Sequence, residues 1–270
     1  MENNIKAAII DLYDGETNQG IRCIKDILSE SGLKFDIFEM RGKNETPTTD
    51  YDIYISSGGP GSPWDGEGKK WEDDYFKLMD ALWANNQNPT NKKKYVFFIC
   101  HSFQIMVRYF GLGEVVMRNS KSFGIYPIHK TKSGEVEKLF KELSDPFYAA
   151  DFREWQVIQP NLKRLDQLGS KIIALEKIRP HVDLERAVMA IRVSNEFFGT
   201  QFHPEADPES MHYHFMKPDR REHVVSKYGE ERYNEMLNLC ESEDGIKLTR
   251  KSVLPGFLKE AIKQLNNENT

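Results

Sequence analysis

Three residues whose side chains can act together in covalent catalysis lie far apart in this sequence, each beside a strand-like segment. Cys100 follows the apolar run YVFFI, and His203 and Glu205 follow the run FFGTQF. A cysteine nucleophile needs a nearby base, and the base needs a carboxylate that holds its tautomer and stabilises the imidazolium. Alternate side chains of an extended segment point the same way, so His203 and Glu205 suit these two roles. The residues therefore predict a nucleophile, a base and an orienting acid.

Two features of the surrounding sequence favour this chemistry. Cys100 lies between a predicted strand and a predicted helix, where a strand-to-helix elbow presents the thiol and the helix N-terminus stabilises a thiolate. Residues 58–63 (GGPGSP) follow another predicted strand, and such a loop can turn backbone N–H groups toward one point, as an oxyanion hole requires. Taken singly, each feature has an ordinary explanation: a buried cysteine, a Gly/Pro turn and a common His-x-Glu pair.

The elements that must position these residues follow from the hydrophobic pattern. Short apolar runs alternate with segments of helical spacing, which predicts an α/β fold with an open, mostly parallel, doubly wound sheet. In such a sheet, ligands bind beyond the carboxyl ends of the strands, where the candidate residues lie. Strands are predicted at 7–12, 34–40, 51–55 and 95–99, with helices through 21–28, 71–83 and 104–110.

The second half of the sequence has a different pattern. Shorter mixed segments between residues 113 and 159 predict an antiparallel excursion at one edge of the sheet, and 188–193 and 197–202 predict a hairpin. From residue 216 the sequence becomes charged and helical, with a predicted break at 254–256 (LPG). This extension could dock a partner, pair with a second copy in a homo-oligomer, or pack on the sheet of its own chain.

Composition limits the classes of function. The chain has 270 residues, a net charge of −5 and a hydrophobic fraction of 39%, enough apolar side chains for a normal core. At roughly 150 residues per domain the length corresponds to about 1.8 domains, which we divide into a catalytic domain at 1–215 and a helical extension at 216–270. The longest basic run, residues 92–94, is short, so we expect no nucleic-acid or membrane partner.

The cysteines indicate a reducing compartment. There are three, an odd number, and their wide spacing fits neither a disulfide framework nor a zinc site. Cys23 lies among the isoleucines of a predicted helix and is expected in the core, whereas Cys240 lies in the charged extension with no expected role. Because the first residues, 1–6, lack the pattern of a signal peptide, we expect a cytoplasmic protein. His203 has only His212 and His214 nearby, so no metal is predicted.

Three motifs, in this order, resemble those of the class I (triad-type) glutamine amidotransferases. They are residues 58–63 (GGPGSP), 100–104 (CHSFQ) and 199–205 (GTQFHPE), and the resemblance covers roughly residues 5–210. This family includes the glutaminase parts of GMP synthase, carbamoyl-phosphate synthase and anthranilate synthase. The resemblance implies a flavodoxin-like sheet, no cofactor, and glutamine or a γ-glutamyl amide as the substrate.

The resemblance also implies a role for each matching residue. Cys100 attacks the γ-carboxamide carbon of glutamine, His203 acts as base, and Glu205 orients His203. The backbone N–H groups of Gly59 and His101 bind the tetrahedral oxyanion, ammonia leaves, and water hydrolyses the glutamyl thioester. The residues implied in substrate binding are Gly58, Pro60, Gly61 and Gln104.

The chain departs from the family pattern at the elbow and before the last strands. Phe98 and Ser102 stand where the family usually has glycine, so either the turn packs differently or the pocket is reshaped. A serine-histidine motif of the GMP synthase type is also missing. Residues 153–156 take its region, where Trp155 either walls the pocket or belongs to the core. The His101 ring is a further candidate for the lining of the site.

Three functions are consistent with these residues. The first is a glutaminase that releases ammonia for an acceptor on another polypeptide, such as a synthetase subunit, because the sequence has no P-loop of its own. The second is a γ-glutamyl hydrolase that cleaves γ-glutamyl amides or peptides. The third is a catalytically silent binding partner of a synthetase, which the presence of all three triad residues disfavours.

Overall fold

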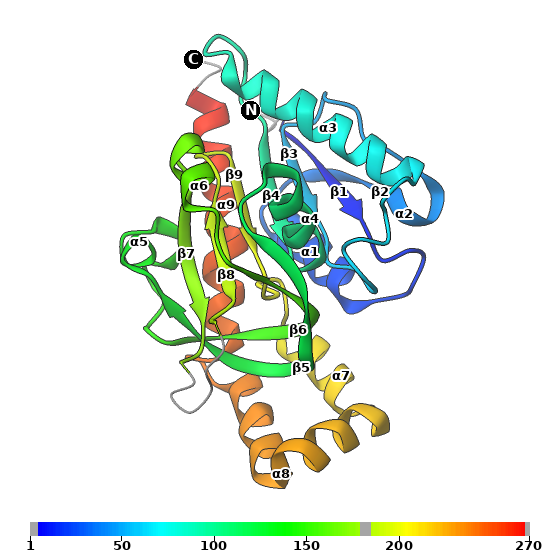
Figure 1. Cartoon of the computed structure of the whole chain (residues 1–270), viewed down its shortest axis with the longest axis vertical. Helices are drawn as coiled ribbons and strands as arrows, with labels where there is room; N and C mark the ends of the chain where they lie inside the picture. Colours follow the sequence, from blue (N-terminus) through cyan, green and yellow to red (C-terminus); the bar gives the residue numbers. More distant parts are fainter. Residues whose placement is uncertain (1–4, 179–184, 268–270) are drawn as a thin grey trace.

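A nine-stranded sheet forms the centre of the computed structural model, which describes residues 5–178 and 185–267. Its strand order is β2-β1-β3-β4-β9-β8-β7-β5-β6 (Figure 1). The strands from β2 to β9 in this order run parallel, and β8, β7, β5 and β6 are each antiparallel to the strand before. The predicted α/β sheet, its antiparallel edge and the hairpin of β8 and β9 are therefore confirmed.

The element bounds agree with the predicted alternation. The strands are β1 (Lys6–Asp11), β2 (Lys34–Glu39), β3 (Ile53–Ser56), β4 (Tyr95–Ile99), β5 (Glu114–Lys130), β6 (Phe147–Ile158), β7 (Lys171–Glu176), β8 (Val188–Arg192) and β9 (Phe197–Thr200). The helices are α1 (Gln19–Glu30), α2 (Met40–Lys43), α3 (Lys70–Gln87), α4 (His101–Phe110), α5 (Lys132–Glu135), α6 (Leu162–Leu168), α7 (Pro208–Phe215), α8 (Pro218–Glu241) and α9 (Ile246–Asn267), with a short 3₁₀ helix η1 (Lys138–Phe140).

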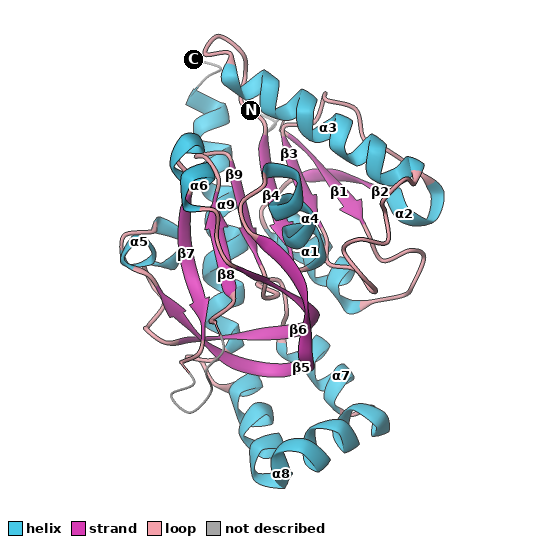
Figure 2. Cartoon of the chain, in the orientation of Figure 1, coloured by secondary structure: helices cyan, strands magenta, loops and turns pink. Residues whose placement is uncertain are grey.

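Helices cover both faces of the sheet (Figure 2). Helices α1 and α9 share one buried apolar cluster with the strands, and α3 and α4 share the other. This doubly wound arrangement explains why β1, β3 and β4 are continuous apolar runs, since both of their faces are buried.

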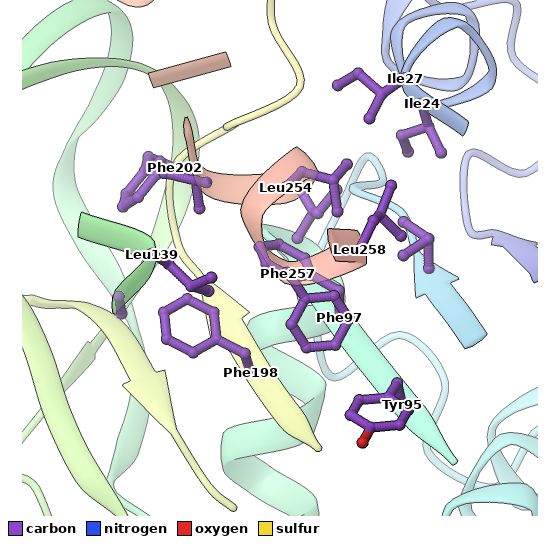
Figure 3. Packing of buried hydrophobic residues seen from close by; sticks show 14 of the residues in the cluster. Ile24, Ile27, Tyr95, Phe97, Leu139, Phe198, Phe202, Leu254, Phe257 and Leu258 are labelled. Carbon is purple, nitrogen blue, oxygen red and sulfur yellow. The ribbon is translucent and has the colours of Figure 1, made fainter. Parts of the chain in front are cut away.

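Helix α9 corrects the predicted break at 254–256. The helix continues through Pro255, because Leu254, Phe257 and Leu258 are buried against Phe97 and other side chains of the sheet (Figure 3). Tertiary packing outweighs the local cost of proline here. Of the three alternatives for the extension, α9 follows the third: it packs on the sheet of its own chain.

Helices α7 and α8 pack elsewhere, on the β5–β6 end of the sheet (Figure 1). A third apolar cluster joins Phe215, Val224 and Met236 of these helices to Phe123 and Ile125 of β5. The helical extension is confirmed, whereas the domain boundary at residue 215 stays a prediction. Residues 1–4, part of the segment used for the signal-peptide expectation, lie outside the described residues. No helix within 5–178 and 185–267 is both long and apolar enough to cross a membrane.

The carboxyl ends of four parallel strands meet at one edge of the sheet. The register places Ile10 of β1 beside Ser56 of β3, Ser56 beside Phe98 of β4, and Phe98 beside Gly199 of β9. The loops after these strands therefore converge, and they carry the candidate residues.

Candidate active site

Cys100 occupies a strained elbow between β4 and α4. Its backbone has φ 50° and ψ −96°, a conformation that a non-glycine residue adopts only where surrounding contacts enforce it. One such contact is the Cys100 N–H, which donates to the Thr200 carbonyl of β9 at 2.7 Å. The elbow thus holds the sulfur at the N-terminus of α4, as the sequence predicted.

Phe98 and Ser102, the departures from the family pattern, both point away from the cavity that Cys100 lines. Phe98 is fully buried in the cluster beneath α3 and α4. The Ser102 hydroxyl donates to the Ser56 carbonyl at 2.7 Å and accepts from the Ile99 N–H at 2.8 Å. The serine thus ties the elbow to β3, and neither side chain lines the pocket.

His203 and Glu205 follow β9 and form a buried pair. His203 Nδ1 lies 2.8 Å from a carboxylate oxygen of Glu205, and the two residues are 9% and 1% exposed. The backbone N–H of His203 donates to the Ala150 carbonyl of β6 at 2.8 Å, so strand β6 fixes the histidine backbone. No sequence motif predicts that anchor, since it depends on the antiparallel edge of the sheet.

The charges around His203 favour its protonated form. Burial alone would lower the pKa of His203, but the negative charges of Glu205 and of the Cys100 sulfur, with hydrogen bonds to both, raise it well above the usual histidine value. Because Nδ1 faces Glu205, Nε2 remains for the thiol. The histidine is therefore set to exchange a proton with groups bound at Cys100.

The Gly-Pro loop after β3 packs tightly against its neighbours. A Cβ on Gly59 would lie 2.5 Å from the Leu12 carbonyl oxygen, so only glycine fits there. Arg41 fixes the loop by donating to the Pro60 carbonyl at 2.7 Å. Within the described residues, the backbone N–H groups of Gly59 and His101 donate to no protein acceptor, as groups reserved for an oxyanion would.

Two glutamines connect Cys100 to the cavity wall. Gln104 Nε2 donates to Gln201 Oε1 at 3.0 Å and to the Trp155 carbonyl at 3.1 Å. Gln201 Nε2 in turn lies 3.6 Å from the Cys100 sulfur. Gln104 was predicted from its motif. Gln201 belongs to the 199–205 motif, but no role was predicted for it.

A cavity of about 330 Å³ opens over Cys100. Trp155 both lines it and packs against the core. The two alternatives for this residue, a pocket wall and a core side chain, are therefore both correct. Two predicted site residues do not line the cavity but contact the His203 ring. Glu205 lies 2.8 Å from His203 Nδ1, and a Cβ on Gly58 would lie 3.0 Å from His203 Cε1. The predicted residues that line the cavity are Gly59, Pro60, Gly61, Cys100, His101, Gln104 and His203.

Several lining residues were missed, because no motif marks them. Tyr13 follows β1, Phe152 belongs to β6, and His214, Lys217 and Arg220 come from α7, α8 and the segment between them. Burial, with the negative charges of Glu205 and Cys100, raises the pKa of Tyr13 well above its ordinary value. Tyr13 thus remains a hydrogen-bond donor in the cavity.

Two further histidines line the cavity in their neutral forms. Burial, then the charges of Arg41 and Arg108, lowers the pKa of His101 to about 3. Burial, then the charges of Lys217, His203 and Arg220, lowers the pKa of His214 to about 4. Among the described residues that line the cavity, His203 is therefore the one histidine with a carboxylate partner and a raised pKa. No group of three metal-ligating side chains gathers in the part of the chain that the structure describes.

An α/β sheet with a cysteine elbow, a buried His-Glu pair and a glycine loop at one edge is the arrangement that a cysteine-dependent amide hydrolase requires. The family model for class-I glutamine amidotransferases matches residues 8–219, and the chain belongs to that family. No curated protein sequence matches the chain significantly.

Solved structures show the same fold at low sequence identity. A glutamine amidotransferase from Thermotoga maritima is 16% identical, with a TM-score of 0.66 over 96% of this chain and 98% of that one. A glutamine amidotransferase from Methylobacillus flagellatus is 14% identical, with a TM-score of 0.59 over 98% and 94%. The glutaminase domain of Trypanosoma brucei CTPS, solved with bound acivicin, is 16% identical, with a TM-score of 0.54 over 75% and 86%.

Proposed function

We propose that this protein is a glutaminase that hydrolyses the side-chain amide of glutamine through Cys100, His203 and Glu205. The observation that carries the proposal is the buried pair in which His203 Nδ1 lies 2.8 Å from Glu205, at the same cavity that the Cys100 sulfur and the His203 ring both line. Membership of the class-I amidotransferase family supports the same reaction type.

The proposed reaction proceeds through a thioester. The Cys100 sulfur attacks the γ-carbonyl carbon, and the N–H groups of Gly59 and His101 stabilise the oxyanion. His203 gives its proton to the departing nitrogen, the C–N bond breaks, and ammonia leaves. Water, deprotonated by His203, then attacks the thioester carbon and releases glutamate. In this proposal Gln104 contacts the bound glutamine, together with the loop residues Gly58, Pro60 and Gly61.

The proposal includes a separate acceptor for the ammonia. The Trypanosoma brucei neighbour is the glutaminase domain of a CTPS, and we infer that a synthetase subunit receives the ammonia that this chain releases. The proposal also includes a cytoplasmic location, where a free catalytic thiol stays reduced.

Substitution of each cysteine tests the proposed chemistry. Cys100→Ala should abolish glutamate release from glutamine and labelling by diazo-oxo-norleucine, while the melting temperature stays close to that of the parent protein. Cys23→Ala and Cys240→Ala are the matched controls, since both thiols are buried away from the cavity, and both variants should retain turnover. Turnover that survives Cys100→Ala would contradict the proposal.

A further inference from the structure

A second cavity, of about 250 Å³, lies across strands β5 and β6 from the active-site cavity. Phe123 of β5 and Phe152 of β6 line the active-site cavity. Their neighbours in sequence, Ser122 and Asp151, line the second one. Because alternate side chains of a strand point to opposite faces, the two cavities open on opposite faces of this pair of strands. The second cavity is therefore a separate site that shares a wall with the active site.

An irregularity in the strand pairing directs polar side chains into the second cavity. The ladder between β5 and β6 shifts register between Met117 and Ser122. Arg118, Ser120 and Lys121, which lie within this irregularity, all line the cavity. Bulges re-aim side chains and are common beside functional sites. The irregular pairing thus brings two cations to the cavity wall.

The second cavity is positively charged, although the whole chain has a net charge of −5. Among the described residues, its lining includes four cations and two carboxylates, namely Arg118, Lys121, Lys177 and Lys227 with Asp151 and Glu176. Both carboxylates are also bound by Arg153, whose fully buried side chain lies 3.0 Å from each of them. An anion in this cavity would therefore meet an excess of positive charge.

Two arginines share one carboxylate oxygen at this wall. Arg118 Nη2 and Arg153 Nη2 each lie 3.0 Å from Glu176 Oε1. Burial, then the charge of Arg153, lowers the pKa of Arg118, so the two guanidinium groups repel each other. Arg153 Nη1 is buried and donates to no acceptor in the part of the chain that the structure describes. A buried donor in this state is costly, and an anion beside the two arginines would reduce both costs.

Two tyrosine rings hold lysines at the same cavity. The Lys177 ammonium lies 5.3 Å from the centre of the Tyr126 ring, and the Lys227 ammonium lies 5.1 Å from the centre of the Tyr228 ring. Stacking on a ring holds the stem of each side chain and leaves its charge available to a ligand. Lys121 is the less available cation, because it pairs with Glu154 at 2.6 Å.

The volume and the charge of the cavity indicate a small anion with more than one negative charge. Its volume lies below the range of about 300–1,000 Å³ that is usual for drug-sized ligands. Its cations outnumber its carboxylates by more than one. A phosphate group carries close to two negative charges at neutral pH and accepts strong hydrogen bonds from arginine and lysine.

We propose that the second cavity binds a phosphate group, either inorganic phosphate or the phosphate of a small ester, through Arg118, Lys177 and Lys227. None of these three residues lines the active-site cavity. The site is therefore independent of the proposed glutaminase chemistry.

Isothermal titration calorimetry of the full chain tests this site, with inorganic phosphate and glycerol 3-phosphate as the two ligands and the ionic strength held constant. We expect saturable binding at a single site and a rise in melting temperature with ligand concentration, because the ligand binds the folded state. The ligand with the lower Kd identifies the source of the phosphate, free or esterified.

The double variant Lys177→Gln/Lys227→Gln should raise this Kd by at least about tenfold, since it removes two charge-assisted contacts. Both lysines are at least partly exposed, so the buried arginine network stays in place and the variant should fold. The matched control is Lys217→Gln/Arg220→Gln, which removes the same charge from cations of the active-site cavity that do not line the second one. The control should keep the Kd of the parent protein.

Three results would overturn the inference. They are the absence of saturable binding of either ligand in the millimolar range, a Kd that the double variant leaves unchanged, and an equal rise of the Kd in the control. The last would place the anion in the active-site cavity. Glutamine turnover by Cys100 enters none of these measurements, so the glutaminase proposal stands or fails separately.

Discussion

The hydroxyl of Ser102 donates a hydrogen bond to the carbonyl of Ser56, 2.7 Å away, and so joins the elbow that carries Cys100 to the end of β3. The same hydroxyl oxygen accepts the N–H of Ile99 at 2.8 Å. Both partners are buried. A serine where the family usually has glycine therefore stabilises the elbow from the side of β3 and leaves the cavity open.

Ser102→Ala should lower the free energy of unfolding by about 1–3 kcal/mol, because it leaves the buried Ile99 N–H and Ser56 carbonyl without this partner. Turnover should fall as well, since Cys100 relies on its neighbours to hold a rare backbone conformation. Denaturant unfolding and glutaminase assays measure the two effects. Ser226→Ala, at an exposed position on α8, is the control and should change neither. An unchanged stability for Ser102→Ala would show that the elbow does not depend on the serine.

Glu205→Gln should move the alkaline limb of the kcat/KM profile to lower pH. The parent protein holds the pKa of His203 above its usual value, partly through the charge of Glu205. Proton donation to the leaving nitrogen is therefore present below this raised pKa and lost as the pH rises through it. Without the carboxylate charge the pKa falls, and activity ends at lower pH.

The matched control for this profile is Glu154→Gln, which removes a carboxylate that lines the same cavity but pairs with Lys121. Its alkaline limb should stay where it is in the parent protein. An alkaline limb that does not move in Glu205→Gln would show that Glu205 does not set the protonation of His203.

Much of the catalytic edge could be predicted from sequence, because the relevant signals are local. Continuous apolar runs indicated strands buried on both faces, and parallel strands necessarily bring their carboxyl ends together. The segments carrying Cys100, Gly59 and His203 each follow such a strand, so the structure brings them to one edge. Their catalytic roles stay proposals that the substitutions above test.

The rest depends on packing between distant segments. Pro255 does not end α9, since the apolar face of that helix is buried against the sheet. Phe152 and Lys217 reach the cavity only because β6 and the last helices fold over its open side, and Tyr13 reaches it from the loop after β1. No local pattern encodes such placements, which explains why these lining residues were missed.

Gly58→Ala should reduce turnover by at least about tenfold with little loss of stability. A Cβ at this position would lie 3.0 Å from both His203 Cε1 and the Tyr13 hydroxyl, so the histidine ring must shift relative to Cys100. Small displacements of catalytic groups are costly to rate. Gly42→Ala, whose new Cβ would meet no atom closer than 3.4 Å, is the control. Full activity in Gly58→Ala would mean that the ring tolerates this displacement.

Arg22 and Asp207 join α1 to the beginning of α7, and we expect this pair to position the part of the cavity that α7 forms. One guanidinium nitrogen of Arg22 lies 2.8 and 3.0 Å from the two Asp207 oxygens, and Asp207 also caps α7 by accepting from the Ser210 N–H at 2.7 Å. Arg22→Gln should raise KM more than it lowers kcat, because His214 and the residues after it line the cavity.

The energetic coupling of this pair should be about 1 kcal/mol in a double-mutant cycle of Arg22→Gln and Asp207→Asn, since both side chains are partly exposed. Burial raises the pKa of Asp207, but its bonds to Arg22 and Ser210 outweigh that effect and leave the pKa below its ordinary value. The coupling should therefore be full at neutral pH and vanish as the pH falls through the lowered pKa. The pair Arg221–Glu230 on α8, whose side chains are 50% and 52% exposed, should show almost no coupling in the same cycle. Equal coupling in the two pairs would remove the reason to assign Arg22 a positioning role.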